Sequence, residues 1–283
     1  MGFSNFGQIK SSWDEGRHTL FTWRKTPAQT TGAGIWFDLS MSLGVPSPNY
    51  YASSPATAAL LTAQGLNVGG NVSPYSKHLM SLMAMTTTAA ATPLVLILCD
   101  YVLYYPFMDM SDTSEQTMDN TVTVPRYTSS GGLQIIAVEV AAMVGGATFI
   151  INYTNDQGVS GRTTPTITCN TQTAVGTLVN TDRAVATMAG PFIRLQGTDT
   201  GVQKIDSVTF LTPDTGLLTF VLVKPIATMT IRSIDAPVEV NYLKDFSQLP
   251  LISDGSYLNF LALPNGTLSG APIHGIIESV WSS

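Results

Sequence analysis

An acidic run in the middle of the chain holds the residue types best suited to chemistry. Asp109, Asp112, Glu115 and Asp119 follow one another with no basic residue among them. Closely spaced carboxylates can hold a cation, and two of Asp109, Asp112 and Glu115 could act as acid and base in a hydrolase that cleaves glycans. The alternating aspartates and central glycine of a calcium loop are absent. A solvated acidic loop is therefore favoured over a metal site.

A doubled tripeptide gives a second chemical hypothesis. Asp199–Gly201 and Asp214–Gly216 both read Asp-Thr-Gly, and in aspartic proteases two such loops bring together carboxylates that share a proton. Here Val202 and Leu217 stand where that family has Ser or Ala. Because Asp and Gly are also what tight turns require, we interpret the two copies as turns and not as a protease site.

Other catalytic signatures are missing from the sequence. It has no G-x-S-x-G elbow and no Walker loop, and its histidines have no metal-ligand spacing. Cys99 and Cys169 are too few for a disulfide framework or a zinc cluster, so we expect two buried free thiols. The sequence thus predicts no catalytic residue, no cofactor and no bound metal, and a protein that is not an enzyme.

The charge balance and the apolar segments exclude two classes of partner. The chain has 13 Lys and Arg against 19 Asp and Glu, which argues against nucleic acid as the main partner. The start shows no signal-peptide pattern, so synthesis in the cytoplasm is expected. The longest apolar region, residues 79–107, is interrupted by Pro93 and Asp100, so no membrane span is predicted.

The scarcity of charge is the most informative feature of the composition. Charged residues make up 11% of the chain, against roughly 25% in an average soluble domain. Between Thr26 and Ser76 the only charged side chain is Asp38. A surface with so little charge is poorly protected against association. We therefore expect other subunits to cover much of it, as in a homo-oligomer or an assembly.

Residues 1–50 show no sustained period of helix or strand and are predicted to form an extended N-terminal arm. Within it, Trp13, Trp23, Arg24 and Trp36 are the candidate interface anchors, because aromatic residues and arginine are enriched at the centre of interfaces. Packing in the core is the alternative for the tryptophans.

Residues 51–283 are predicted to form a β-rich domain with two short helices. Ser54-Pro55 and Ser73-Pro74 are start signals for helices near residues 55–64 and 74–85. The methionines of the second segment are interpreted as core filler rather than as a binding surface. A third short helix is considered for the tail, over Ile273–Val280.

Alternation of apolar and polar residues predicts a sheet core over residues 121–242. Within it, residues 205–223 are typical of a hairpin with its turn at 213–216. Pro93–Pro106 is predicted to be a buried strand. Regular short strands separated by turns rich in Gly, Asn and Asp favour a mainly β fold, an antiparallel β-sandwich or jelly roll, with the N-terminal arm and two short α-helices added.

Two stretches resemble known proteins. Leu98–Tyr127, together with Phe6–Pro27, resembles virion structural proteins of tailed bacteriophages, of the capsid-associated or minor structural kind. The resemblance includes no motif with a defined chemical role. It implies a component of the virion, assembled in the host cytoplasm, that decorates or cements the capsid and binds copies of itself and the major capsid protein. The alternatives are a tail or fibre protein that contacts the host surface and a glycan-acting hydrolase.

Overall fold

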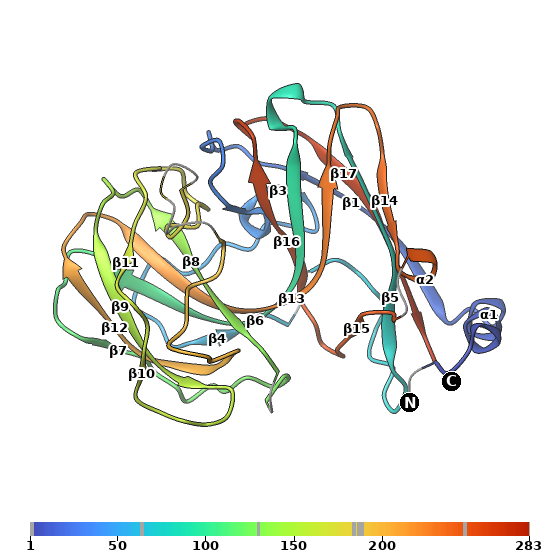
Figure 1. Ribbon diagram of the computed structural model, residues 1–283, viewed down its shortest axis with the longest axis horizontal. Coiled ribbons are helices and arrows are strands. Elements are labelled where there is room, and N and C mark those ends of the chain that lie inside the picture. The colour runs from blue at the N-terminus through green and yellow to red at the C-terminus, as the bar shows by residue number, and fades with distance from the viewer. Residues whose placement is uncertain are drawn as a thin grey trace.

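Two β-sandwiches lie side by side and share one central sheet (Figure 1). The computed structural model describes residues 3–62, 65–128, 131–182, 185, 190–245 and 248–282. In these residues the strands form three antiparallel sheets, here called A, B and C. Sheet B is the shared one, sheet A lies over one end of it, and sheet C lies over the other.

The strands of each sheet come from distant parts of the chain. Sheet A runs β14 (Val238–Asn241), β5 (Lys77–Thr86), β17 (Ile273–Trp281), β1 (His18–Thr26) and β3 (Leu43–Val45), with β15 (Leu251–Ile252) paired to β5. Sheet B runs β2 (Phe37–Asp38), β16 (Leu258–Pro264), β6 (Leu94–Asp109), β13 (Leu217–Ile231) and β8 (Gln134–Ala141), with β4 (Ala59–Leu60) paired to β6. Sheet C runs β10 (Arg162–Thr163), β9 (Thr148–Asn155), β12 (Val202–Thr212) and β7 (Gln116–Thr117), with β11 (Ile167–Thr168) paired to β9. The α-helices are α1 (Phe6–Asp14) and α2 (Tyr242–Asp245), and 3₁₀ turns cover Leu39–Met41 and Ala89–Ala91.

The long strands β6 and β13 run through both sandwiches and connect them. They have 16 and 15 residues and pair with each other along nearly their whole length. Both are almost continuously apolar, which is typical of strands buried on both faces. Their first and last halves therefore contribute to different cores.

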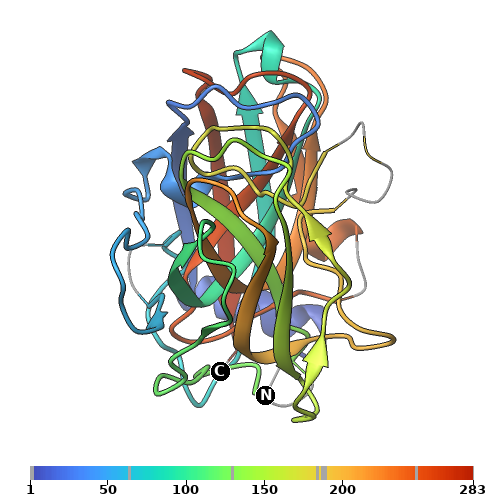
Figure 2. The ribbon, with the colours of Figure 1, turned by 90° about the vertical axis from the view of Figure 1, so that its left-hand side faces the viewer.

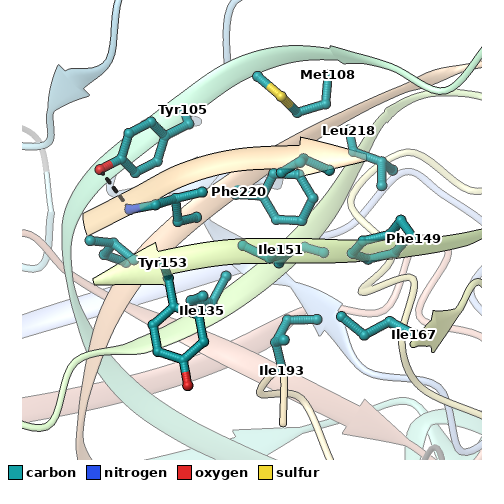
Figure 3. Close-up of a cluster of buried hydrophobic side chains, with 14 of the residues drawn as sticks. Tyr105, Met108, Ile135, Phe149, Ile151, Tyr153, Ile167, Ile193, Leu218 and Phe220 are labelled. Carbon is teal, nitrogen blue, oxygen red and sulfur yellow. Dashed lines mark hydrogen bonds between the residues drawn. The ribbon is translucent and has the colours of Figure 1, made fainter. Parts of the chain in front are cut away.

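Three apolar cores fill the spaces on either side of sheet B. Sheets A and B enclose one core around Trp23, Leu82 and Phe260. Sheets B and C enclose a second, in which Phe149 packs against Phe220 (Figure 3). The third lies on the opposite face of sheet B, which irregular segments with Trp36, Tyr51 and Leu178 cover. Figure 2 shows the second sandwich from its sheet-C side.

The predicted fold class is confirmed: the molecule is mainly β, antiparallel and a sandwich, with two α-helices in the described residues. The predicted positions of the helices are wrong. Residues 74–85 fall mostly on β5, whose buried and half-buried residues alternate as in a strand. Residues 55–62 are irregular apart from β4, and residues 63 and 64 lie outside the described chain. The tail segment predicted to be a helix is β17. Its apolar residues fit the spacing of a helix as well as that of a strand, and pairing with β1 and β5 makes it a strand.

The prediction of an extended arm over residues 1–50 is also wrong. This segment contains α1 and β1, and β1 pairs along its length with β17 in the middle of sheet A. Trp23 fills the adjacent core. The alternation in β1 is masked in the sequence because its outward positions include Leu20, an apolar residue that is 56% exposed.

The predicted hairpin over residues 205–223 has the correct strands and turn but the wrong pairing. β12 pairs with β9 and β7 in sheet C, whereas β13 pairs with β6 and β8 in sheet B. The turn between them crosses from one sheet to the other. Val208 and Phe220 therefore meet in the same core from opposite sides. The sheets also extend well beyond the predicted core of residues 121–242, because β1, β5, β6, β16 and β17 lie outside it.

Candidate subunit-contact surface

The carboxylates of the acidic run accept hydrogen bonds from nearby turns and from sheet C. Asp109 and Asp112 each accept hydrogen bonds from the serine two residues later, and these bonds lower the pKa of Asp112. Glu115 instead accepts from Ser207 and Asn152 of sheet C. Among the described residues no three His, Cys, Asp or Glu side chains gather as a metal site requires. The three acids are therefore tied to local turns and to the sheet.

The two Asp-Thr-Gly turns hold their carboxylates with separate sets of donors. Asp199 accepts two hydrogen bonds from Arg162, at 2.8 and 3.2 Å, and others from Tyr153 and Asn155. These partners lower its pKa to about 2. Asp214 accepts from the backbone N–H groups of residues 144 and 145. Both turns are structural, as their sequence favours.

The cysteines are free and buried, as predicted. Cys99 lies in the core on the outer side of sheet B, and Cys169 in the core beside sheet C. Burial raises the pKa of both thiols, that of Cys169 to about 12.

The candidate interface anchors divide into two groups. Trp23 and Trp36 are 3% and 6% exposed and belong to the cores of this chain, so their prediction as interface anchors is wrong. Trp23 packs on Phe260, with ring centroids 4.6 Å apart. Trp13 and Arg24 are exposed, and Trp13 stacks on His18 with ring centroids 3.7 Å apart.

The outer face of sheet A presents apolar side chains that no core of this chain buries. Leu79, Leu82 and Ala84 of β5 face the core, so Met83 and Met85 point outward and are half-buried. Ile276 of β17 lies beside Met83 in the register of the sheet. We call Leu20, Met80, Met83, Met85 and Ile276 the methionine face. The interpretation of its methionines as core filler is therefore wrong, because they lie on the opposite side of β5 from the core.

Helices α1 and α2 bound this face at one end, at the right of Figure 1. Between them lies a cavity of about 550 Å³, lined by Phe3, Phe6 and Ile9 on one side and by Tyr242 and Leu243 on the other. Phe6 is 65% exposed. Ser4, Asn5 and Gln248 also line the cavity, and no residue of the methionine face does.

His78 also lines this cavity. It belongs to β5, two residues before Met80. Its Nδ1 lies 3.3 Å from the carbonyl oxygen of Leu249, its Nε2 is buried without a partner, and burial lowers its pKa. Burial of the imidazole thus disfavours its charged form.

Charged side chains lie beside members of the methionine face: Glu278 pairs with Leu20, and Glu239 pairs with Met83. Arg24 lies beside His274 in the register, and Glu278 accepts a 2.7 Å hydrogen bond from Ser81. Glu239 is exposed on the edge strand β14. Exposed methionines are adaptable, because their unbranched chains can repack against different partners. Sequence reasoning missed this surface because Met80 and Met83 are three residues apart, which in a regular strand places them on opposite faces. A register shift between β5 and β17 lies beside Met80 and interrupts the regular alternation there.

Asp38 is a fully buried carboxylate whose contacts hold neighbouring segments together. It is fully buried and accepts hydrogen bonds from Tyr51, Tyr101 and both the N–H and the hydroxyl of Ser40. Burial raises its pKa in spite of these donors. No described cavity reaches it, so it braces the segment that covers sheet B.

Fold and surface together describe an antiparallel β-sandwich whose outer sheet face carries partly exposed apolar side chains. No protein-family model and no curated protein matches the chain. Among solved structures, the chain has a weak similarity to VP2 of infectious bursal disease virus in a subviral particle. The identity is 11% and the TM-score is 0.16, and the match covers 93% of this chain and 80% of that one. A mutant VP2 of the same virus in derived T=1 particles gives 12% identity and a TM-score of 0.16, with coverage of 93% and 78%. Scores this low carry no conclusion about fold or function. In the described residues no helix is both long and apolar enough to cross a membrane.

Proposed function

We propose that the protein is a structural component of a virus particle and acts by binding neighbouring subunits rather than by catalysis. The methionine face is the observation that carries this proposal. Apolar side chains that stay partly exposed on one face of a sheet, in a chain with 11% charged residues, are typical of a surface that a partner covers.

The finer proposal is a bacteriophage capsid component of the decoration, cement or minor structural kind. It is supported by the resemblance of residues 6–27 and 98–127 to virion proteins of tailed bacteriophages. Its partners are then copies of itself and the major capsid protein. Burial of the methionine face would stabilise both the assembly and the folded chain, because binding that requires the folded state is linked to folding.

The enzyme alternative finds no support in the geometry. Asp109 and Asp112 hold their own turns and Glu115 is bonded to sheet C. A tail or fibre protein that binds host glycans would use exposed aromatic or acidic pockets. The cavity between α1 and α2 is lined by aromatic side chains and by no acidic one, so it offers only the aromatic part of such a site.

The test is the concentration dependence of self-association. Sedimentation velocity and electron microscopy of the whole chain are expected to show oligomers or particles. Ile276→Asp places a charge in the centre of the methionine face and is expected to give mainly monomers with unchanged circular dichroism. Thr209→Asp, on the outer face of sheet C, is the matched control and should assemble like the wild type. A wild-type chain that stays monomeric at all concentrations, alone and with capsid proteins, would refute the proposal. Deletion of residues 1–50 would not test self-association, because it removes β1 from sheet A and would disrupt the fold.

A further inference from the structure

A buried carboxylate lies under the short turn that follows β8. Glu139 is in the edge strand β8 of sheet B and is 0% exposed. Its backbone is bonded on one side to β13 and on the other to residues 176 and 177, through N–H···O distances of 2.8 and 2.9 Å. Its side chain therefore cannot reach water without a movement of the segments around it.

The hydrogen bonds of this carboxylate are incomplete. One oxygen accepts from the N–H of Met143 at 3.2 Å, and Oε2 is buried without a partner. An ionised carboxylate needs several donors when it is buried. A neutral carboxylic acid fits this site better, because it carries no charge that the site would have to solvate.

The turn over Glu139, residues 142–146, is held by two carboxylates at once. Met143 donates to Glu139, while Val144 and Gly145 donate to Asp214 at 3.1 and 2.6 Å. The next N–H, of Gly146, donates to the carbonyl oxygen of Cys169. Val144, at the tip, is 70% exposed. The turn is thus held through backbone N–H groups by two acidic side chains from different strands and turns.

The other groups around Glu139 give it no positive charge. Asp214, from the turn between β12 and β13, repels a negative charge on it, and the Cys169 thiol lies near both acids. The covering segments, residues 142–146 and 174–178, contain no ionisable side chain. Asp109, the last residue of β6, pairs with Leu217 of β13, the strand next to β8, and it is again an acid.

We propose that the turn at residues 142–146 is a pH-sensitive element: it is docked while Glu139 is protonated and loosens when Glu139 ionises beside Asp214. Burial first, and the charge of Asp214 in addition, raise the pKa of Glu139 to about 7. The loosened turn lets water reach the carboxylate and changes the surface around Val144. This inference goes beyond the proposed function and does not depend on it.

The expected size of the effect follows from linkage. An exposed Glu ionises near 4.5, and the buried one near 7. Between these values the docked form holds a proton that the open form has lost, so a rise in pH favours opening. From pH 5.5 to 8.5 the opening constant should rise about 30-fold.

Hydrogen exchange of the amides of residues 143–146 measures this opening, after correction for the intrinsic pH dependence of exchange. The wild type should show the rise of about 30-fold. Glu139→Gln, which resembles the protonated acid, should show none. Glu239→Gln, at an exposed edge, is the matched control and should behave like the wild type.

Two outcomes would overturn the proposal. One is an equal pH dependence of opening in the wild type and in Glu139→Gln. The other is a carboxyl titration of Glu139, followed by carbon NMR in the wild type, with a midpoint near that of an exposed Glu. The second measurement needs no variant, so it remains decisive if Glu139→Gln folds poorly.

Discussion

The buried ion pair of Asp100 and Arg126 allows a quantitative test of how the loop after β7 is fixed to sheet B. Arg126 donates to both oxygens of Asp100 at 2.6 Å, and Tyr127 and the N–H of Tyr257 donate to the same carboxylate. The two charged side chains are 8% and 0% exposed. Burial still raises the pKa of Asp100, which indicates that the arginine does not fully offset the loss of hydration.

Arg126→Met removes the cation and leaves the carboxylate buried. Breaking a buried pair in this way costs about 3–5 kcal/mol, so we expect the free energy of unfolding at pH 7 to fall by that amount. The cost should shrink as the pH is lowered, because the orphaned carboxyl takes up a proton in the folded state. Urea unfolding followed by tryptophan fluorescence at several pH values measures both effects.

The double variant separates the lost pair from the buried charge that the single variant leaves behind. Asp100→Asn added to Arg126→Met keeps the acceptor for Tyr257 and removes the charge, so its stability should return to within about 1 kcal/mol of the wild type. Arg232→Met, at an exposed position, is the matched control and should change stability by less than about 0.5 kcal/mol. If Arg126→Met behaves like this control, the ion pair is not what fixes the loop and the reasoning is wrong.

Three further changes have expected outcomes. Tyr101→Phe removes a 2.8 Å hydrogen bond to the buried Asp38 and should cost about 1.5–3 kcal/mol in urea unfolding, whereas Tyr50→Phe, at a residue 65% exposed, should cost nothing measurable. Gly275→Ala would place its Cβ 2.3 Å from the carbonyl oxygen of Met83 and 2.4 Å from the ring of Trp23. We therefore expect the free energy of unfolding to fall by about 1–3 kcal/mol and the tryptophan emission to shift. Unchanged stability and emission would contradict that contact. Both cysteines are buried, so a thiol reagent should react with them only at the rate of unfolding, and fast labelling of the folded protein would show that the cores around them are open.

The sequence predicted the fold class and much of its strand content. Pro93–Pro106 was predicted as a buried strand, and it is the larger part of β6 because an uninterrupted apolar run fits a strand covered on both faces. The turns at Asp199 and Asp214 were predicted from the conformational demands of turns. For the candidate surface the prediction is only partly useful: scarce charge predicts a contact surface, but Trp23 and Trp36, two of the candidate anchors, are core residues.

By itself, then, the sequence determined that the chain forms antiparallel β-structure with little charge, because both follow from the local order and types of residues. Only the tertiary structure decided which strands pair, which face of β5 meets the core, and that the carboxylate of Glu139 is buried. β1 and β17 are separated by almost the whole chain and yet are hydrogen-bonded neighbours. The methionine face and the setting of Glu139 both depend on such long-range pairing, since burial is a property of what packs against a residue and not of the residue itself.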